Sequence, residues 1–151
     1  MTNLHTFFAK VGEEETTRRL FLQCFAAWTN RDLEGALSCM SEDVAHILNL
    51  DGTLVPYGAS VEGKPALRKK LQLLLDTFEF GALVNESLSV EGRKATGRYK
   101  FIYIHCASGE RLSGSFRFII EQRDGLIVRM EEYHDAAYVE AFVRLVSMPR
   151  N

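Results

Sequence analysis

The sequence contains few cysteines and no closely spaced cysteine pair. Its 151 residues include only Cys24, Cys39 and Cys106, and there is no CxxC motif. An odd number at long spacings argues against a disulfide framework or a thiolate zinc site, and is typical of proteins in a reducing compartment. We therefore expect three free thiols, buried as small apolar groups.

Long apolar runs and an excess of basic residues are also missing. Lys and Arg total 18 against 20 Asp and Glu, for a formal charge of -2, so clustered phosphate contacts are not expected. No run approaches the roughly 20 apolar residues that span a bilayer, and residues 1–10 have no basic segment before an apolar stretch. We expect a cytoplasmic protein with no nucleic-acid or membrane partner.

Aromatic residues, in contrast, are abundant. They make up 11% of the chain, with 10 Phe, 5 Tyr and 1 Trp. The length suits one domain with a substantial core, and no linker or repeat divides it. We predict a single domain over residues 1–151, with its core at about residues 13–146, and enough aromatics to line a cavity as well as fill that core.

The first half of the chain has the period of helices. Apolar residues from Phe21 to Trp28 recur at spacings of three and four, which predicts a helix starting at the acidic cluster of residues 13–15. Polar residues 30–32 end it, and a shorter helix is predicted over Leu33–Met40. Pro65 is suited to the first turn of a third helix that extends to Phe78.

The second half changes to the alternation of strands. Three turn signals, at residues 91–92, 108–109 and 123–125, separate the runs. The predicted strands are Leu83–Val90, Gly97–His105, Ser113–Gln122 and Leu126–His134, followed by a helix over Ala136–Val146. Helices followed by an antiparallel meander indicate an α+β protein, with helices covering one face of a curved sheet.

The last predicted strand carries the sharpest functional signal. Because Arg129 and Glu131 suit solvent, the opposite face should point inward, and it carries Glu132 and His134 together with Val128 and Met130. A carboxylate in an apolar hollow is costly unless paired. Burial would raise the pKa of Glu132 and an imidazolium would lower it, so the pair could transfer protons near neutral pH. A reversed register, or a dimer interface on the sheet, is the alternative.

Two further positions on these strands allow more than one interpretation. The face that carries Tyr103 and His105 could line a cavity, or could be core packing that ends in a satisfied histidine. Asp135 lies between the last strand and the final helix, where we interpret it as a helix N-cap rather than a catalytic acid.

Four segments resemble a known family. They are Ala26–Gly35, Met40–Val44, Val61–Leu67 and Asp124–Asp135, and they resemble the SnoaL-like and ketosteroid isomerase-like domains of the nuclear transport factor 2 superfamily. The similarity extends from about Glu13 to Val146. It implies a cone-shaped α+β barrel, with N-terminal helices packed on a curved, mostly antiparallel sheet and a C-terminal helix. It also implies a pocket between sheet and helices, and a homodimer formed through the sheet.

The resemblance does not carry over the catalytic groups of two well-defined branches. Ketosteroid isomerases use an Asp base with a Tyr and a protonated Asp, and the alignment puts Leu48, Cys24 and Phe116 at or near those places. Limonene epoxide hydrolase-like relatives have an acid that resembles Glu132 in position. Their Arg-x-Asp partner is missing from the strand before His105, so both mechanisms are disfavoured.

These considerations lead to two hypotheses. The first is a SnoaL-like enzyme without cofactor, of isomerase, cyclase or dehydratase type, acting on a small lipophilic carbonyl substrate. Its catalytic residues would be Glu132, His134 and His46, the last of which shares a strand face with Leu48. Its substrate-binding residues would be Trp28, Tyr57, Tyr103, His105, Phe116 and Met130. The second hypothesis is a non-catalytic module for ligand binding or dimerisation. Metal binding is disfavoured, because the histidines lack HxH or HxxxH spacing.

Overall fold

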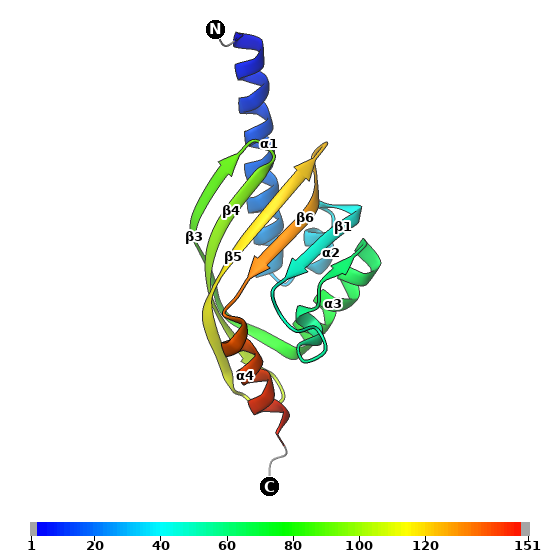
Figure 1. Cartoon of the computed structure of the whole chain (residues 1–151), viewed down its shortest axis with the longest axis vertical. Coiled ribbons are helices and arrows are strands. Elements are labelled where there is room, and N and C mark those ends of the chain that lie inside the picture. The colour runs from blue at the N-terminus through cyan, green and yellow to red at the C-terminus, as the bar shows by residue number, and fades with distance from the viewer. Residues whose placement is uncertain (1–2, 149–151) are drawn as a thin grey trace.

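The computed structural model describes residues 3–148 and shows helices packed on one curved sheet (Figure 1). In chain order the elements are α1 (Leu4–Thr29), α2 (Leu33–Leu37), β1 (Met40–Leu48), η1 (Pro56–Gly58), β2 (Val61–Glu62), α3 (Lys64–Thr77), β3 (Phe78–Glu91), β4 (Lys94–His105), β5 (Arg111–Arg123), β6 (Leu126–Tyr133) and α4 (Ala136–Ser147). Within the described range, no helix combines the length and the apolar character that a membrane span requires.

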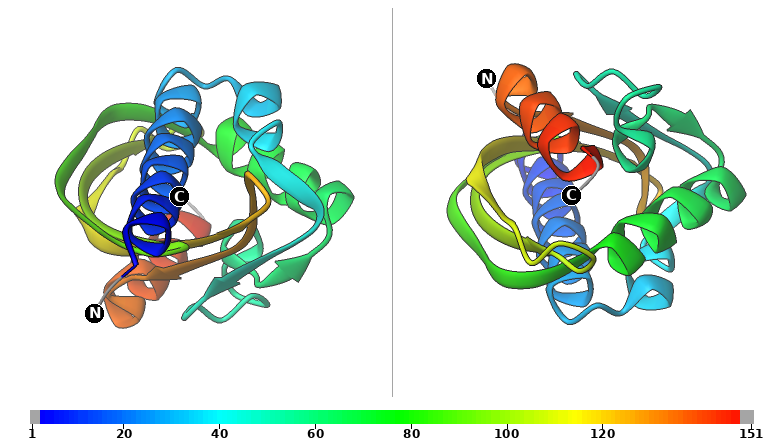
Figure 2. Two further views of the ribbon diagram at one scale, coloured as in Figure 1. Left: turned by 90° about the horizontal axis from the view of Figure 1, so that it is seen from above. Right: turned by 90° about the horizontal axis from the view of Figure 1, so that it is seen from below.

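The six strands form a single sheet in the order β2-β1-β6-β5-β4-β3. All neighbours are antiparallel except β1 and β6, which run parallel. Figure 2 shows the sheet curling so that α1, α2 and α3 close its concave side. The predicted α+β class is confirmed: N-terminal helices pack on a curved, mostly antiparallel sheet, and a C-terminal helix follows.

Helix α1 packs its apolar stripe into the concave sheet, where Phe21 is fully buried against Tyr99 and Phe118. The helix begins nine residues before the predicted start, because Asn3 caps it by accepting a hydrogen bond from the amide of His5. The acidic cluster of residues 13–15 is therefore inside the helix, and its role as an N-terminal turn was wrong.

The polar break after α1 is present, but the next helix is shorter than predicted. Asp32 caps α2 by accepting from the amide of Gly35, and α2 ends at Leu37. Met40 was predicted to be helical, but it pairs with Ile127 of β6 and begins β1. An amphipathic pattern cannot reveal that a parallel partner strand lies within reach.

All four predicted strands exist, and all three predicted turns separate them. The inward face of β6 needs one correction, because Ile127 is fully buried whereas Val128 is only half-buried. The register between β5 and β6 shifts beside Gln122, and the extra residue on β6 reverses the alternation at that end. From Met130 onward, the side chains predicted to point inward do so. An alternating sequence does not reveal a bulge of this kind.

The cysteines only partly follow the expectation. All three are free, and Cys24 and Cys39 are buried, but Cys106 is exposed. It lies in the turn between β4 and β5, where the chain leaves the sheet.

Candidate functional site

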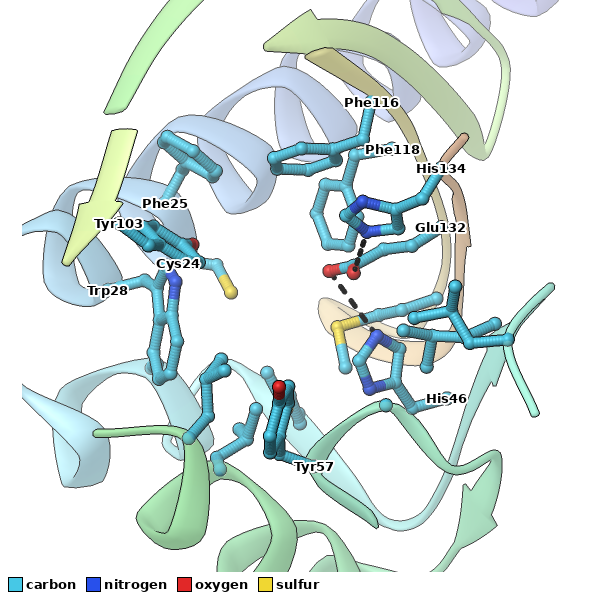
Figure 3. Close-up of a pocket in the computed structure, with 18 residues that line it drawn as sticks. Cys24, Phe25, Trp28, His46, Tyr57, Tyr103, Phe116, Phe118, Glu132 and His134 are labelled. Atoms are coloured by element: carbon cyan, nitrogen blue, oxygen red, sulfur yellow. Dashed lines mark hydrogen bonds and ion pairs between the residues drawn. The ribbon is translucent and has the colours of Figure 1, made fainter. Parts of the chain in front are cut away.

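A cavity of about 100 Å³ lies between the concave face of the sheet and the helices (Figure 3). Most of its wall is apolar and comes from α1, α3, β1, β5 and β6. The ionisable side chains on the wall are those of Cys24, His46, Tyr57, Tyr103, Glu132 and His134. The cavity is also lined by Cys24, Leu48 and Phe116. These are the residues that the resemblance puts at or near the catalytic positions of ketosteroid isomerases.

Glu132 and His134 reach this wall from the end of β6. His134 Nε2 lies 3.1 Å from Oε2 of Glu132, in hydrogen-bond geometry. The Glu132 side chain is 21% exposed and lines the cavity. Figure 3 shows both side chains on the same side of the cavity.

His46 completes the cluster from β1. The parallel pairing of β1 with β6 sets His46 beside Met130 and Leu48 beside Glu132. The His46 ring is almost fully buried, and its Nε2 lies 3.4 Å from Oε1 of Glu132. That contact is long and poorly aligned, so Nε2 lacks a good hydrogen bond. Catalytic hydrogen bonds are often loose before a ligand is bound.

The two imidazoles control the ionisation of Glu132. Burial by itself would raise the pKa of this carboxyl, but the contacts with His134 and His46 outweigh burial and hold the pKa well below its ordinary value. Glu132 is therefore a carboxylate at neutral pH, with one imidazole at each oxygen. Such a carboxylate orients the rings and stabilises an imidazolium.

Lys70 of α3 belongs to the same cluster, although the sequence interpretation missed it. Its Nζ lies 2.6 Å from Nδ1 of His46 and donates to the carbonyl of Ala59 at 2.8 Å. Burial lowers the pKa of Lys70 to about 8, against the opposite effect of Glu132. A signal was available, because Lys70 stands three residues after Leu67, on the buried stripe of α3.

Two phenols approach the cavity from other elements. Tyr103 of β4 lies across the cavity from Glu132 in Figure 3 and is hydrogen-bonded to Trp28. Tyr57 packs edge-on against Phe78, with its hydroxyl pointing into the cavity. Burial raises the pKa of Tyr57 to about 12 and also raises that of Tyr103, so both remain hydroxyl donors at neutral pH.

The structure places five of the six predicted substrate-binding residues on the cavity wall. These are Trp28, Tyr57, Tyr103, Phe116 and Met130. His105 is absent from the wall: its Nδ1 lies 2.7 Å from Oγ of Ser108, and its ring packs edge-on against Phe78 and Phe142. Among residues 3–148, no group of three or more His, Cys, Asp or Glu side chains is arranged to hold a metal ion.

Solved structures with a similar fold come from several proteins. An NTF2-like protein of unknown function from Burkholderia pseudomallei is 18% identical with a TM-score of 0.74, over 88% of this chain and 98% of that one. TerC, co-crystallised with polyporic acid, is 19% identical with a TM-score of 0.73, over 85% and 98%. An LEH-like epoxide hydrolase from M. tuberculosis is 15% identical with a TM-score of 0.70, over 89% and 92%. At these identities the likeness concerns the fold alone.

Sequence comparison identifies the family. Curated proteins give no significant match to the chain. The SnoaL-like domain family, in contrast, matches residues 21–130, which is most of the sequence and runs from the C-terminal part of α1 to the middle of β6. The chain therefore belongs to the family of SnoaL-like domains.

Proposed function

We propose that this protein is an enzyme that performs acid/base chemistry without a cofactor on a small lipophilic carbonyl compound, as an isomerase, cyclase or dehydratase. The observation that carries this proposal is the Glu132 carboxylate on the cavity wall, with an imidazole at each oxygen. A purely structural ion pair would be expected in the core or on the surface rather than on the wall of an apolar cavity.

The chemistry begins with removal of a proton beside the carbonyl group. An imidazole of the Glu132 cluster accepts the proton, and the carboxylate stabilises the resulting imidazolium. The electron pair of the broken C–H bond moves to the carbonyl oxygen as an enolate. Return of the proton to another atom gives an isomer, while attack by the enolate on a second carbonyl closes a ring.

The phenols are suited to hold the oxygen of that enolate. Tyr103 faces the cluster across the cavity. Tyr57 offers a second hydroxyl from the loop before β2. Donors aimed at a developing oxyanion in a dry site are among the strongest contributors to catalysis.

The remaining wall suggests the character of the ligand. Phe25, Phe118 and Met130 give apolar and aromatic contact surface, which favours a lipophilic molecule. TerC, one of the structural neighbours, was crystallised with the small organic compound polyporic acid. A ligand of moderate size would fill the cavity and leave its carbonyl between the phenols and the carboxylate.

The test is turnover of a panel of enolisable and cyclisable carbonyl compounds by the wild type, Glu132→Gln and Glu131→Gln. Glu131 precedes Glu132 on the opposite face of β6 and serves as the matched control. We expect turnover by the wild type and the control, and loss in Glu132→Gln. Equal turnover by Glu132→Gln would remove this carboxylate from the mechanism. Binding without turnover by any variant would favour a ligand-binding module.

We also propose a homodimer formed through the outer face of the sheet. Val84 on β3 is 57% exposed and Ile104 on β4 is 37% exposed, which leaves apolar surface on that face. Sedimentation should give the mass of two chains for the wild type, and Val84→Glu should shift it toward one. A wild type that remains monomeric at micromolar concentration would contradict the proposal.

A cytoplasmic location is the last part of the proposal. It is supported by the free thiols of Cys24 and Cys39, which are buried in the core without a disulfide, as is usual for proteins of a reducing compartment. Fractionation of cells that express the protein with a C-terminal tag would test it, since recovery in a secreted or membrane fraction would overturn it.

A further inference from the structure

The two imidazoles at Glu132 differ in what their other nitrogen contacts. His46 Nδ1 lies 2.6 Å from the Lys70 ammonium, whereas His134 Nδ1 is buried without a hydrogen-bond partner within residues 3–148. We propose that Lys70 is a positioning residue that keeps His46 neutral, so that His134 is the imidazole that exchanges a proton with the ligand. This inference rests on the acid/base function proposed above.

The position of Lys70 fixes the tautomer of His46. Lys70 is 5% exposed and lines a groove formed by α2, α3, η1 and β2. An ammonium group only donates hydrogen bonds, so both of its partners must be acceptors. One is the carbonyl of Ala59, and the other is Nδ1 of His46. The ring proton of His46 is then on Nε2, toward Glu132.

Protonation of His46 would put two cations in direct contact. Burial is the largest cause that lowers the pKa of His46; Glu132 opposes it, and Lys70 and His134 lower the pKa further. The resting charges are therefore positive on Lys70, zero on His46 and negative on Glu132. In this arrangement Nε2 of His46, which carries the ring proton, faces the carboxylate at 3.4 Å, and the ring does not compete for a proton from the ligand.

His134 has no such cation behind it. Its Nε2 faces Oε2 of Glu132, and its ring stacks on Phe116 with centroids 4.8 Å apart. With the ring proton on Nε2, the lone pair of Nδ1 is free to accept a proton. Nδ1 is buried in the ligand-free protein, so the His134 ring turns toward the cavity to receive the proton from the ligand carbon. The electron pair of the C–H bond stays with the ligand as the enolate, and the positive charge formed on the ring is balanced by Glu132.

Other titratable groups near the carboxylate do not compete for that proton. Cys24 of α1 and Tyr103 of β4 both face Glu132, and burial, assisted by this negative charge, raises the pKa of each. Both groups remain neutral at physiological pH. The assignment therefore depends on the two histidines and Lys70.

The direct test is ¹⁵N NMR of the histidine rings, from about pH 5 to about pH 9, without any ligand. We expect His46 of the wild type to remain neutral with its proton on Nε2. In Lys70→Met the apparent pKa of His46 should rise by about one to two units, the usual effect of removing a neighbouring like charge. Lys69→Met, the exposed neighbour on α3, is the control and should resemble the wild type.

Lys70→Arg separates charge from packing and provides a test if Lys70→Met fails to fold. Arginine keeps a permanent cation at this site, so His46 should stay neutral. A proton on Nδ1 of His46 in the wild type, an unchanged His46 titration in folded Lys70→Met, or a His46 that takes up a proton as readily in Lys70→Arg as in Lys70→Met would each overturn the assignment.

The NMR result is independent of turnover. If no carbonyl compound reacts, the acid/base function fails while the unequal ionisation of the two rings can still be observed. If turnover is found, His134→Gln should abolish it, and His46→Gln should reduce it less. Equal losses in both variants would contradict the unequal roles.

Discussion

The two faces of β6 carry consecutive glutamates with nearly equal exposure and very different surroundings. The Glu131 side chain is 23% exposed and that of Glu132 is 21% exposed. Glu131 pairs with Arg129 at 3.2 Å on the outer face. Glu132 faces an apolar cavity and meets two imidazoles.

The difference shows that exposure alone does not decide what a carboxylate does. A guanidinium beside a surface carboxylate forms an ion pair that water and salt weaken. Two imidazoles beside a cavity carboxylate form a unit in which a proton can be stored and returned. Whether a carboxylate has a structural or a catalytic role therefore depends on its partners rather than on the area that it exposes to solvent.

The largest expected contrast between the two faces is in turnover. Glu132→Gln keeps the shape of the side chain but removes the charge that stabilises an imidazolium, so kcat should fall by about 100-fold or more. Glu131→Gln should leave kcat unchanged. Steady-state kinetics on a reactive carbonyl compound would measure both, and equal losses would remove the distinction between the faces.

The second contrast concerns Lys70 of α3, the buried cation behind His46. The pKa of Lys70 is lowered from 10.5 to about 8, so between these values the unfolded chain binds a proton that the folded chain has released. The free energy of unfolding of the wild type should therefore rise with pH relative to that of Lys70→Met. Over this interval the rise should be about 3 kcal/mol. Urea unfolding between about pH 8 and about pH 10 would show it. If the difference in unfolding free energy between the two proteins did not change with pH, Lys70 would have an ordinary pKa in the folded protein.

The acid range gives a smaller contrast. Because the pKa of Glu132 is held below its ordinary 4.5, the carboxylate stabilises the fold above that pH and loses this effect as the pH falls below it. The stability advantage of the wild type over Glu132→Gln should shrink accordingly, by about 1.4 kcal/mol for each unit of lowered pKa. Added salt should change this stability difference little, since the contacts of Glu132 with the two histidines are shielded from solvent. An advantage independent of pH would contradict this origin.

The smallest expected effect is at the residue after His134. Asp135 accepts a hydrogen bond from the amide of Tyr138 at 3.2 Å and caps α4. Asp135→Ala should cost about 1 kcal/mol of unfolding free energy and leave kcat unchanged. Thermal unfolding and kinetics together would check it. A loss of kcat without a loss of stability would make Asp135 part of the chemistry.

The sequence anticipated much of the fold because local patterns were strong. The stripe around Phe21 and the alternation through β4 and β5 each require one buried face, and the turn residues at 91–92 and 123–125 separate the strands. The errors lie where a distant partner decides the outcome. Met40 leaves the helical pattern to pair with β6, and the bulge beside Gln122 exchanges the burial of Ile127 and Val128.

The site was anticipated in the same uneven way. Glu132 and His134 are two residues apart on one strand, so alternation alone puts them on one face. Lys70 could not be assigned a partner, because it is 24 residues from His46 in the chain and meets it only where α3 packs against β1. His105 shares a face with Tyr103 but reaches the end of β4, where Ser108 and Phe142 enclose it instead of the cavity.

The sequence by itself determined most of the elements, the α+β order, the family resemblance and the inward face of the last strand from Met130 onward, because periodicity and turn chemistry act over a few residues. Only the tertiary structure decided which groups meet at Glu132. The parallel pairing of β1 with β6 brings His46 to one carboxylate oxygen, and the packing of α3 on β1 brings the Lys70 ammonium behind that ring. Charges interact through space, so their partners follow from the packing of distant segments.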